Sequence, residues 1–82
     1  MSTDERPPHP GTVEWVDGAT GEVLGTEPAS GLPDGIAYAR DETGTLRPVV
    51  RIVVTGSEHR REIAQVDETG AVLRRTYQTR AD

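Results

Sequence analysis

The sequence predicts an all-β fold: a small antiparallel sheet of five or six strands arranged in three hairpins. Apolar and polar residues alternate along several short segments, which is the pattern of a strand with one buried face. Clusters of glycine, proline and aspartate separate these segments, as expected for tight turns. A chain of 82 residues has room for one such domain, closed into a compact barrel or sandwich.

Composition divides the chain into a core and two ends. Residues 1–11 hold three prolines and one glycine among polar side chains, which predicts a disordered N-terminal arm. We expect a single β domain over residues 12–78 and a disordered tail over residues 79–82. Phenylalanine is absent and the apolar content is low, so self-association would add useful stability to so small a domain.

Alternation and β-branched residues place the individual strands. Extended runs are expected at residues 12–16, 22–26, 36–40, 45–55, 61–66 and 71–79. Residues 27–35, with two prolines and two glycines, form a loop by composition. Pro48 has no backbone N–H, so it should lie on an edge or at a bulge, where it can split the strand at 45–55.

Residues 57–66 allow two interpretations. Ser57 could cap a short helix that carries Ile63 and Val66 on one side. Arg60 stands where a capping box has Glu or Gln, which weakens that interpretation. We expect a strand here, with the short helix as the alternative.

The tetrapeptide Asp-Glu-Thr-Gly occurs at 41–44 and again at 67–70, and a looser copy lies at 17–21. Each copy lies between two extended runs, where a hairpin turn belongs. Aspartate opens such a turn because its carboxylate accepts hydrogen bonds from the turn's own N–H groups, and glycine closes it in the left-handed conformation. We therefore predict that these residues form structural turns and do not bind calcium. The predicted turn residues are Asp41, Gly44, Asp67 and Gly70.

No arrangement of side chains in the sequence predicts catalysis or a cofactor site. Cysteine is absent, which excludes disulfides and thiolate chemistry. The two histidines lack metal-ligand spacing, Ser57 and His59 lack a third group to orient them, and no phosphate-binding glycine loop occurs. We therefore expect no enzyme activity, no metal and no cofactor. No apolar run is long enough for a signal or a membrane span, so we expect a cytoplasmic protein.

The strand at 45–55 carries apolar residues on both of its faces, and this observation predicts function. One face should pack the core, which leaves the other to dock a partner protein or a second copy of the chain. The candidate partner face consists of Arg47, Val49, Arg51 and Val53. We predict a non-catalytic module for protein–protein interaction, regulation or assembly, acting through a sheet face or edge, with no small-molecule ligand.

The alternative prediction is a small nucleic-acid-binding protein. All nine basic residues are arginine, and most of them lie in the C-terminal half of the chain. The candidate nucleic-acid face consists of Arg47, Arg51, Arg60, Arg61, Arg74 and Arg75. The net charge of −5 and the scarcity of aromatic residues for base stacking favour the protein-interaction module.

Overall fold

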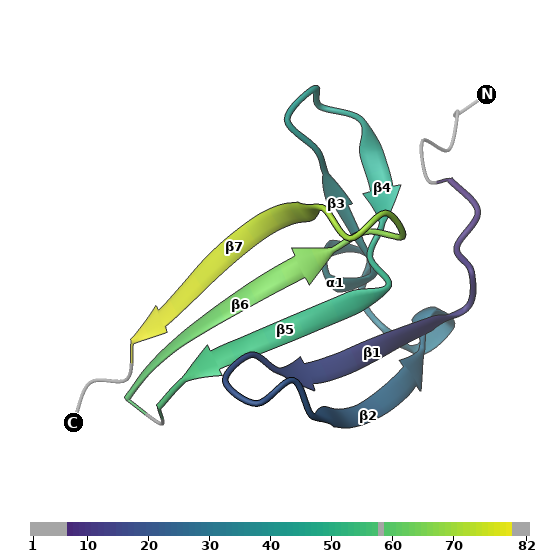
Figure 1. Ribbon diagram of the computed structural model, residues 1–82. Helices are drawn as coiled ribbons and strands as arrows, with labels where there is room; N and C mark the ends of the chain where they lie inside the picture. Colours follow the sequence, from purple (N-terminus) through teal and green to yellow (C-terminus); the bar gives the residue numbers. More distant parts are fainter. Residues whose placement is uncertain (1–6, 58, 80–82) are drawn as a thin grey trace.

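The computed structural model describes residues 7–57 and 59–79 and confirms a small all-β domain (Figure 1). Its strands are β1 (Thr12–Asp17), β2 (Val23–Pro28), β3 (Tyr38–Arg40), β4 (Leu46–Pro48), β5 (Arg51–Gly56), β6 (Arg60–Val66) and β7 (Val72–Thr79). A 3-10 turn, η1 (Ala29–Gly31), and a one-turn helix, α1 (Asp34–Ala37), lie between β2 and β3.

Five strands form one open sheet in the order β2-β1-β5-β6-β7, and β3 pairs with β4 in a separate hairpin. The pairs are antiparallel except β1 and β5, which run parallel with Trp15 beside Ile52. The sheet is thus mixed, where the sequence predicted a purely antiparallel one. Parallel neighbours require a long crossover, and the chain between β2 and β5 supplies it. The sheet keeps two edges, β2 and β7, so it does not close into a barrel.

The predicted strand at 45–55 divides in two, as the lack of an N–H on Pro48 allows. Leu46–Pro48 form β4, and Arg51–Gly56 form β5 in the other sheet. Residues 60–66 form β6, antiparallel to β5, and this excludes the helix considered for 57–66. The Ser57 hydroxyl accepts the N–H groups of His59 and Arg60 at 3.3 and 3.4 Å, so it stabilises the turn before β6.

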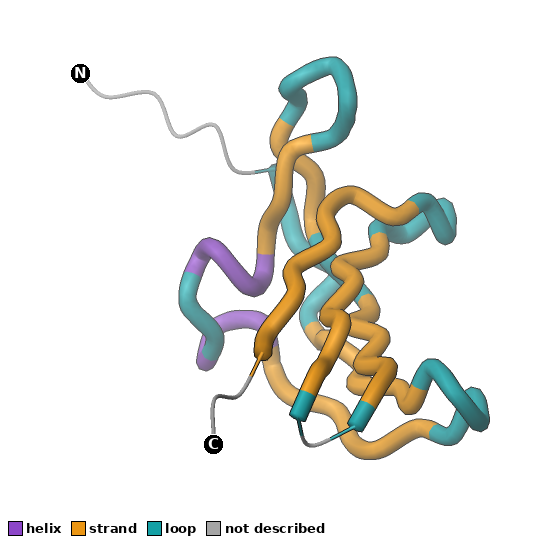
Figure 2. The backbone as a smooth tube through the Cα atoms, turned by 90° about the vertical axis from the view of Figure 1, so that its left-hand side faces the viewer, coloured by secondary structure: helices purple, strands orange, loops and turns teal. Residues whose placement is uncertain are grey.

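The core lies between one face of the five-stranded sheet and the segment 29–40. Val13 and Ile52 enter it from the sheet, Ala39 enters it from the covering segment, and Val49 enters it from the connection between β4 and β5. Partly buried side chains complete it: Trp15, Ala29, Leu32, Ile36, Val54, Ile63 and Leu73. Figure 2 shows both helical turns on one side of the sheet, and within the described ranges no element covers the other side.

The described part of the predicted N-terminal arm is held against β3. The His9 Nε2 atom donates to the Val49 carbonyl oxygen at 2.8 Å, and the Tyr38 hydroxyl donates to the Pro7 carbonyl oxygen at 3.1 Å. The His9 ring also meets the Tyr38 ring edge-on, with 5.6 Å between centroids. Residues 7–11 are therefore anchored, which the sequence did not predict. The remainder of the arm and of the tail, residues 1–6 and 80–82, lies outside the described residues.

Candidate interaction surface

The strand register decides which side chains lie on the uncovered side of the sheet. Directly paired residues lie on one face, and successive residues alternate between faces. Ile52 lies in the core, so its neighbour Val53 points to the uncovered side, together with its partners Val16 on β1 and Ala64 on β6. We call this side the open face. Its side chains on β1, β5, β6 and β7 include Glu14, Val16, Arg51, Val53, Glu62, Ala64, Val66, Arg75 and Tyr77.

The centre of the open face is an apolar strip made of Val16, Val53 and Ala64. Val16 and Ala64 are 9% and 8% exposed, so neighbouring side chains largely cover them, and Val53 is half-buried. Two ion pairs flank it. The Arg51 Nε atom lies 3.1 Å from the Glu14 Oε1 atom, and the equivalent distance from Arg75 to Glu62 is 3.0 Å. Ion pairs exposed to solvent contribute little to stability, so a docking chain can rearrange these side chains at small cost.

Both edges of the sheet carry exposed apolar side chains. Val23 and Leu24 on β2 are 50% and 60% exposed, and Tyr77 on β7 is 61% exposed. Edge strands present backbone N–H and C=O groups that can pair with another chain. Tyr77 lies on the open face beside Glu62, so the apolar strip and an unpaired edge lie next to each other. Tyr77 is an exposed residue that sequence reasoning missed.

The four residues of the predicted partner face do not share one surface. Arg51 and Val53 lie on the open face as expected, but Val49 is 0% exposed. The Val49 N–H donates to the Ala37 carbonyl oxygen at 2.8 Å, which fixes Val49 in the core between the two sheets. Arg47 belongs to β4, in the other sheet. Alternation along 45–55 fails as a guide because the chain passes from one sheet to the other after Pro48.

The six arginines of the predicted nucleic-acid face are also dispersed. Arg51 and Arg75 lie on the open face, and both are ion-paired. Arg74 is paired with Gln65, which is itself paired with the core residue Ile52, so the Arg74 side chain points to the covered side of the sheet. The Arg61 side chain points to the same side, because Arg61 lies four residues before Gln65 on β6. The side chain of the adjacent residue, Arg60, points to the open side. Arg47 lies on β4 and contacts Glu68. The register therefore separates guanidinium groups that the sequence placed on one face.

The three predicted hairpin turns are present and join β1 to β2, β3 to β4 and β6 to β7. In the third turn the Asp67 Oδ1 atom accepts the Thr69 N–H at 2.9 Å, the Thr69 hydroxyl at 2.7 Å and the Ala71 N–H at 3.0 Å. Gly70 closes the turn at φ 88°. This conformation is open to glycine at little cost, which explains why glycine ends each copy.

The second turn repeats this geometry around Asp41. Its Oδ1 atom accepts the Thr43 hydroxyl at 2.6 Å and the Thr45 N–H at 3.0 Å, and Gly44 has φ 85°. The Thr43 hydroxyl is the largest cause of a lowered pKa for Asp41, and the Thr69 hydroxyl is the largest cause of a lowered pKa for Asp67. Both carboxylates thus accept hydrogen bonds from groups within their own turns.

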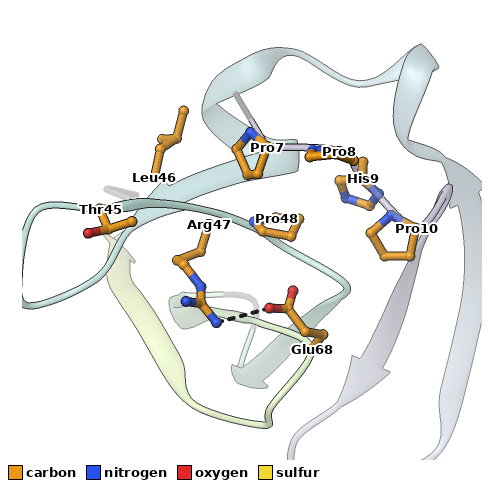
Figure 3. Close-up of a pocket in the computed structure, with 9 residues that line it drawn as sticks. All are labelled: Pro7, Pro8, His9, Pro10, Thr45, Leu46, Arg47, Pro48 and Glu68. Carbon is orange, nitrogen blue, oxygen red and sulfur yellow. Dashed lines mark hydrogen bonds and ion pairs between the residues drawn. The ribbon is translucent and has the colours of Figure 1, made fainter. Parts of the chain in front are cut away.

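A hollow with a volume of about 550 Å³ lies between the N-terminal segment and β4 (Figure 3). Its lining consists of Pro7, Pro8, His9, Pro10, Thr45, Leu46, Arg47, Pro48 and Glu68. The two ring nitrogens of His9 are both engaged, because Nδ1 accepts the Gly11 N–H at 3.0 Å while Nε2 donates to Val49. Arg47 is bound to Glu68. The hollow therefore offers an apolar proline wall and no pair of groups arranged for proton transfer.

Within residues 7–57 and 59–79, no group of three or more His, Cys, Asp or Glu side chains could hold a metal ion. In the same ranges no helix is long and apolar enough to cross a membrane. Comparison with family models, with curated proteins and with solved structures finds no match.

Proposed function

We propose that this protein is a non-catalytic interaction module that binds another protein chain through the open face and edges of its five-stranded sheet. The observation that supports this is the one-sided covering of the sheet: the segment 29–40 packs on one face, and the other carries the apolar strip. An unpaired strand next to an apolar surface supplies the two things a docking strand needs, backbone partners and side-chain contacts.

We also propose that the protein is not an enzyme. A general acid or base works best with a pKa close to neutral, which for a carboxyl group means a raised pKa. Asp41 and Asp67 have pKa values displaced in the opposite direction, by hydrogen bonds within their own turns. We also propose a cytoplasmic location, since a chain without cysteine gains nothing from an oxidising compartment.

Nucleic-acid binding has less support. Polyanion binding needs several cations on one surface, whereas three of the candidate arginines, Arg47, Arg51 and Arg75, are paired with glutamates. The net charge of −5 also repels phosphate at long range.

Site-specific photo-crosslinking in the native cells tests the proposal. A photoreactive residue at Tyr77 or Val53 should give covalent protein adducts of defined mass. The matched control is Glu42, an exposed residue in the β3–β4 turn, which should give none. Retention of the purified protein on heparin or a DNA probe should be weak and insensitive to salt. Adducts equally abundant at Glu42, or tight binding to DNA with a steep salt dependence, would contradict the proposal.

A further inference from the structure

We propose that β7 pairs antiparallel with β7 of a second copy of this chain, so that two five-stranded sheets join into one across a two-fold axis. This inference rests on the proposed function and names its partner. An isologous pairing of this kind closes on itself, because each copy uses the same edge once.

The hydrogen bonding of the sheet shows which backbone groups of β7 face outward. The Ser57 N–H donates to the Arg60 carbonyl oxygen at 2.9 Å, at the start of the β5–β6 ladder. In an antiparallel ladder the backbone groups of successive residues point alternately to the two neighbouring strands. The backbone groups of Arg60 therefore point to β5. Ile63 lies three residues further along the strand, so its backbone groups point to β7.

Ile63 is paired with Thr76, so the backbone groups of Thr76 point back to β6. The N–H and C=O groups of Arg75 and Tyr77, on either side of Thr76, then point away from the sheet. They form a regular row that matches the spacing of an incoming antiparallel strand.

The other edge is less suited to pairing. The β1–β2 register shifts between Trp15 and Val16, and β2 ends at Pro28, which has no N–H to donate. Bulges and prolines are the usual means by which proteins block an edge strand. The β6–β7 register also shifts, between Gln65 and Val66, but β7 pairs with β6 without interruption from Arg74 to Thr79 and contains neither proline nor glycine.

The charges on β7 disfavour one register. Pairing Arg75 with the partner's Arg75 would place like charges directly opposite each other, which is unfavourable. A shift along the strand places Arg75 opposite the partner's Tyr77, where a guanidinium group can lie over an aromatic ring. In this register Thr76 meets the partner's Thr76 at the two-fold axis. Each Arg75 then contacts an aromatic ring in addition to Glu62 of its own chain, which lies 3.0 Å away.

The pairing also extends the open face. Arg75 and Tyr77 lie on the open side of β7, so the apolar strips of the two copies would lie on the same side of the joined sheet. Tyr77, which is 61% exposed in the single chain, would become covered by its neighbour's Arg75.

An engineered disulfide tests the register. The chain has no cysteine, so Thr76→Cys introduces a single thiol. Opposite residues at a non-hydrogen-bonded position lie about 4.5 Å apart between Cα atoms, within the range of a disulfide. We expect Thr76→Cys to convert mostly to a disulfide-linked dimer under oxidised glutathione. Arg74→Cys should remain monomeric, since its two copies lie roughly 13 Å apart along the strands. A mixture of Arg74→Cys with Gln78→Cys should give a mixed dimer.

A proline substitution tests the edge without breaking the fold. Tyr77→Pro removes an outward N–H, which an edge strand tolerates, whereas Tyr77→Phe keeps both the N–H and the ring. Sedimentation at increasing concentration should show a dimer for the wild type and Tyr77→Phe, and a folded monomer for Tyr77→Pro. Thr26→Pro, on β2, should leave the dimer intact.

Two results would overturn the inference. The first is a wild type that stays monomeric at about 1 mM, a concentration at which even very weak pairing is populated. The second is disulfide formation that is as efficient for Arg74→Cys as for Thr76→Cys. If the wild type is monomeric but photo-crosslinking at Tyr77 captures a different protein, β7 self-pairing fails and the proposed function stands. If there is neither a dimer nor an adduct, both fail.

Discussion

The guanidinium group of Arg47 connects two hairpins, because its Nη2 atom lies 2.9 Å from the Glu68 Oε1 atom (Figure 3). The same Nη2 atom lies 3.8 Å from the Asp67 Oδ2 atom. Arg47 belongs to β4, and both carboxylates belong to the turn between β6 and β7. The Asp67 side chain is 5% exposed and the Glu68 side chain is 44% exposed. The two contacts should therefore differ in their contributions to stability.

We expect Arg47→Met to lower the free energy of unfolding by about 1–2 kcal/mol, because it leaves the buried Asp67 carboxylate with one cation fewer. Glu68→Gln should cost at most about 0.5 kcal/mol, as is usual for an exposed pair. Urea unfolding measures both changes, and a double-mutant cycle isolates the Arg47–Glu68 coupling. A larger loss for Glu68→Gln than for Arg47→Met would show that the contact with Asp67 is unimportant.

The closing glycine of the third turn gives a second prediction. Gly70 has φ 88° and open space where a Cβ atom would lie, so Gly70→Ala should cost about 1 kcal/mol through backbone conformation alone. Gly35 in α1 also has open space but no positive φ, and Gly35→Ala is the matched control that should be neutral or slightly stabilising. Thermal unfolding distinguishes them, and equal effects would contradict the assigned turn conformation.

Acid should unfold the protein partly through Asp67. Its pKa in the folded protein is lowered, chiefly by the Thr69 hydroxyl, from an ordinary value of 3.8. A lowered folded-state pKa means that the ionised carboxylate stabilises the fold. This contribution is complete above pH 3.8 and is lost as the pH falls from there through the folded-state pKa.

Thr69→Val should therefore raise the pKa of Asp67 and move the acid unfolding midpoint to higher pH. NMR titration of the Asp67 carboxyl carbon measures the pKa, and urea unfolding between about pH 2 and pH 6 measures the stability. Thr26→Val, on an exposed edge strand, is the control and should leave both unchanged. An unchanged Asp67 pKa in Thr69→Val would mean that the hydroxyl does not bind the carboxylate.

The opposite placements of Val49 and Val53 can be tested with one chemical change. Val49→Thr puts a hydroxyl into the core at a side chain that is 0% exposed, and should cost roughly 2 kcal/mol. Val53→Thr makes the same change at a half-buried side chain on the open face and should cost less, about 1 kcal/mol. Chemical unfolding of the two variants is sufficient, and similar losses would mean that both valines lie in one environment.

Local features of this fold could be predicted from the sequence because they depend on neighbouring residues. The turns at Asp41 and Asp67 require only a carboxylate, a threonine and a glycine at fixed spacing, and both form as predicted. The strand alternation of β1 and β6 is likewise a local pattern. Such signals do not specify which strands become neighbours, so the parallel pairing of β1 with β5 was not predicted.

The errors in the candidate sites have the same origin. Val49 alternates with Arg51 and Val53 in the sequence, but the chain changes sheets between them, so Val49 lies in the core. The anchoring of His9 to the Val49 carbonyl depends on a contact between residues 40 positions apart, for which no local pattern exists. The alternation of Tyr77 with Arg75 was present in the sequence and would have placed both on one face.

Backbone amide exchange, measured residue by residue at several protein concentrations, tests the central claim most directly. In a single chain the Arg75 and Tyr77 N–H groups face away from the sheet. We therefore expect their exchange with solvent to be fast in dilute protein and to slow progressively as concentration rises, with Thr26 on β2 unaffected. Fast exchange at Arg75 and Tyr77 at every concentration, or concentration-dependent protection of Thr26 in their place, would contradict the account.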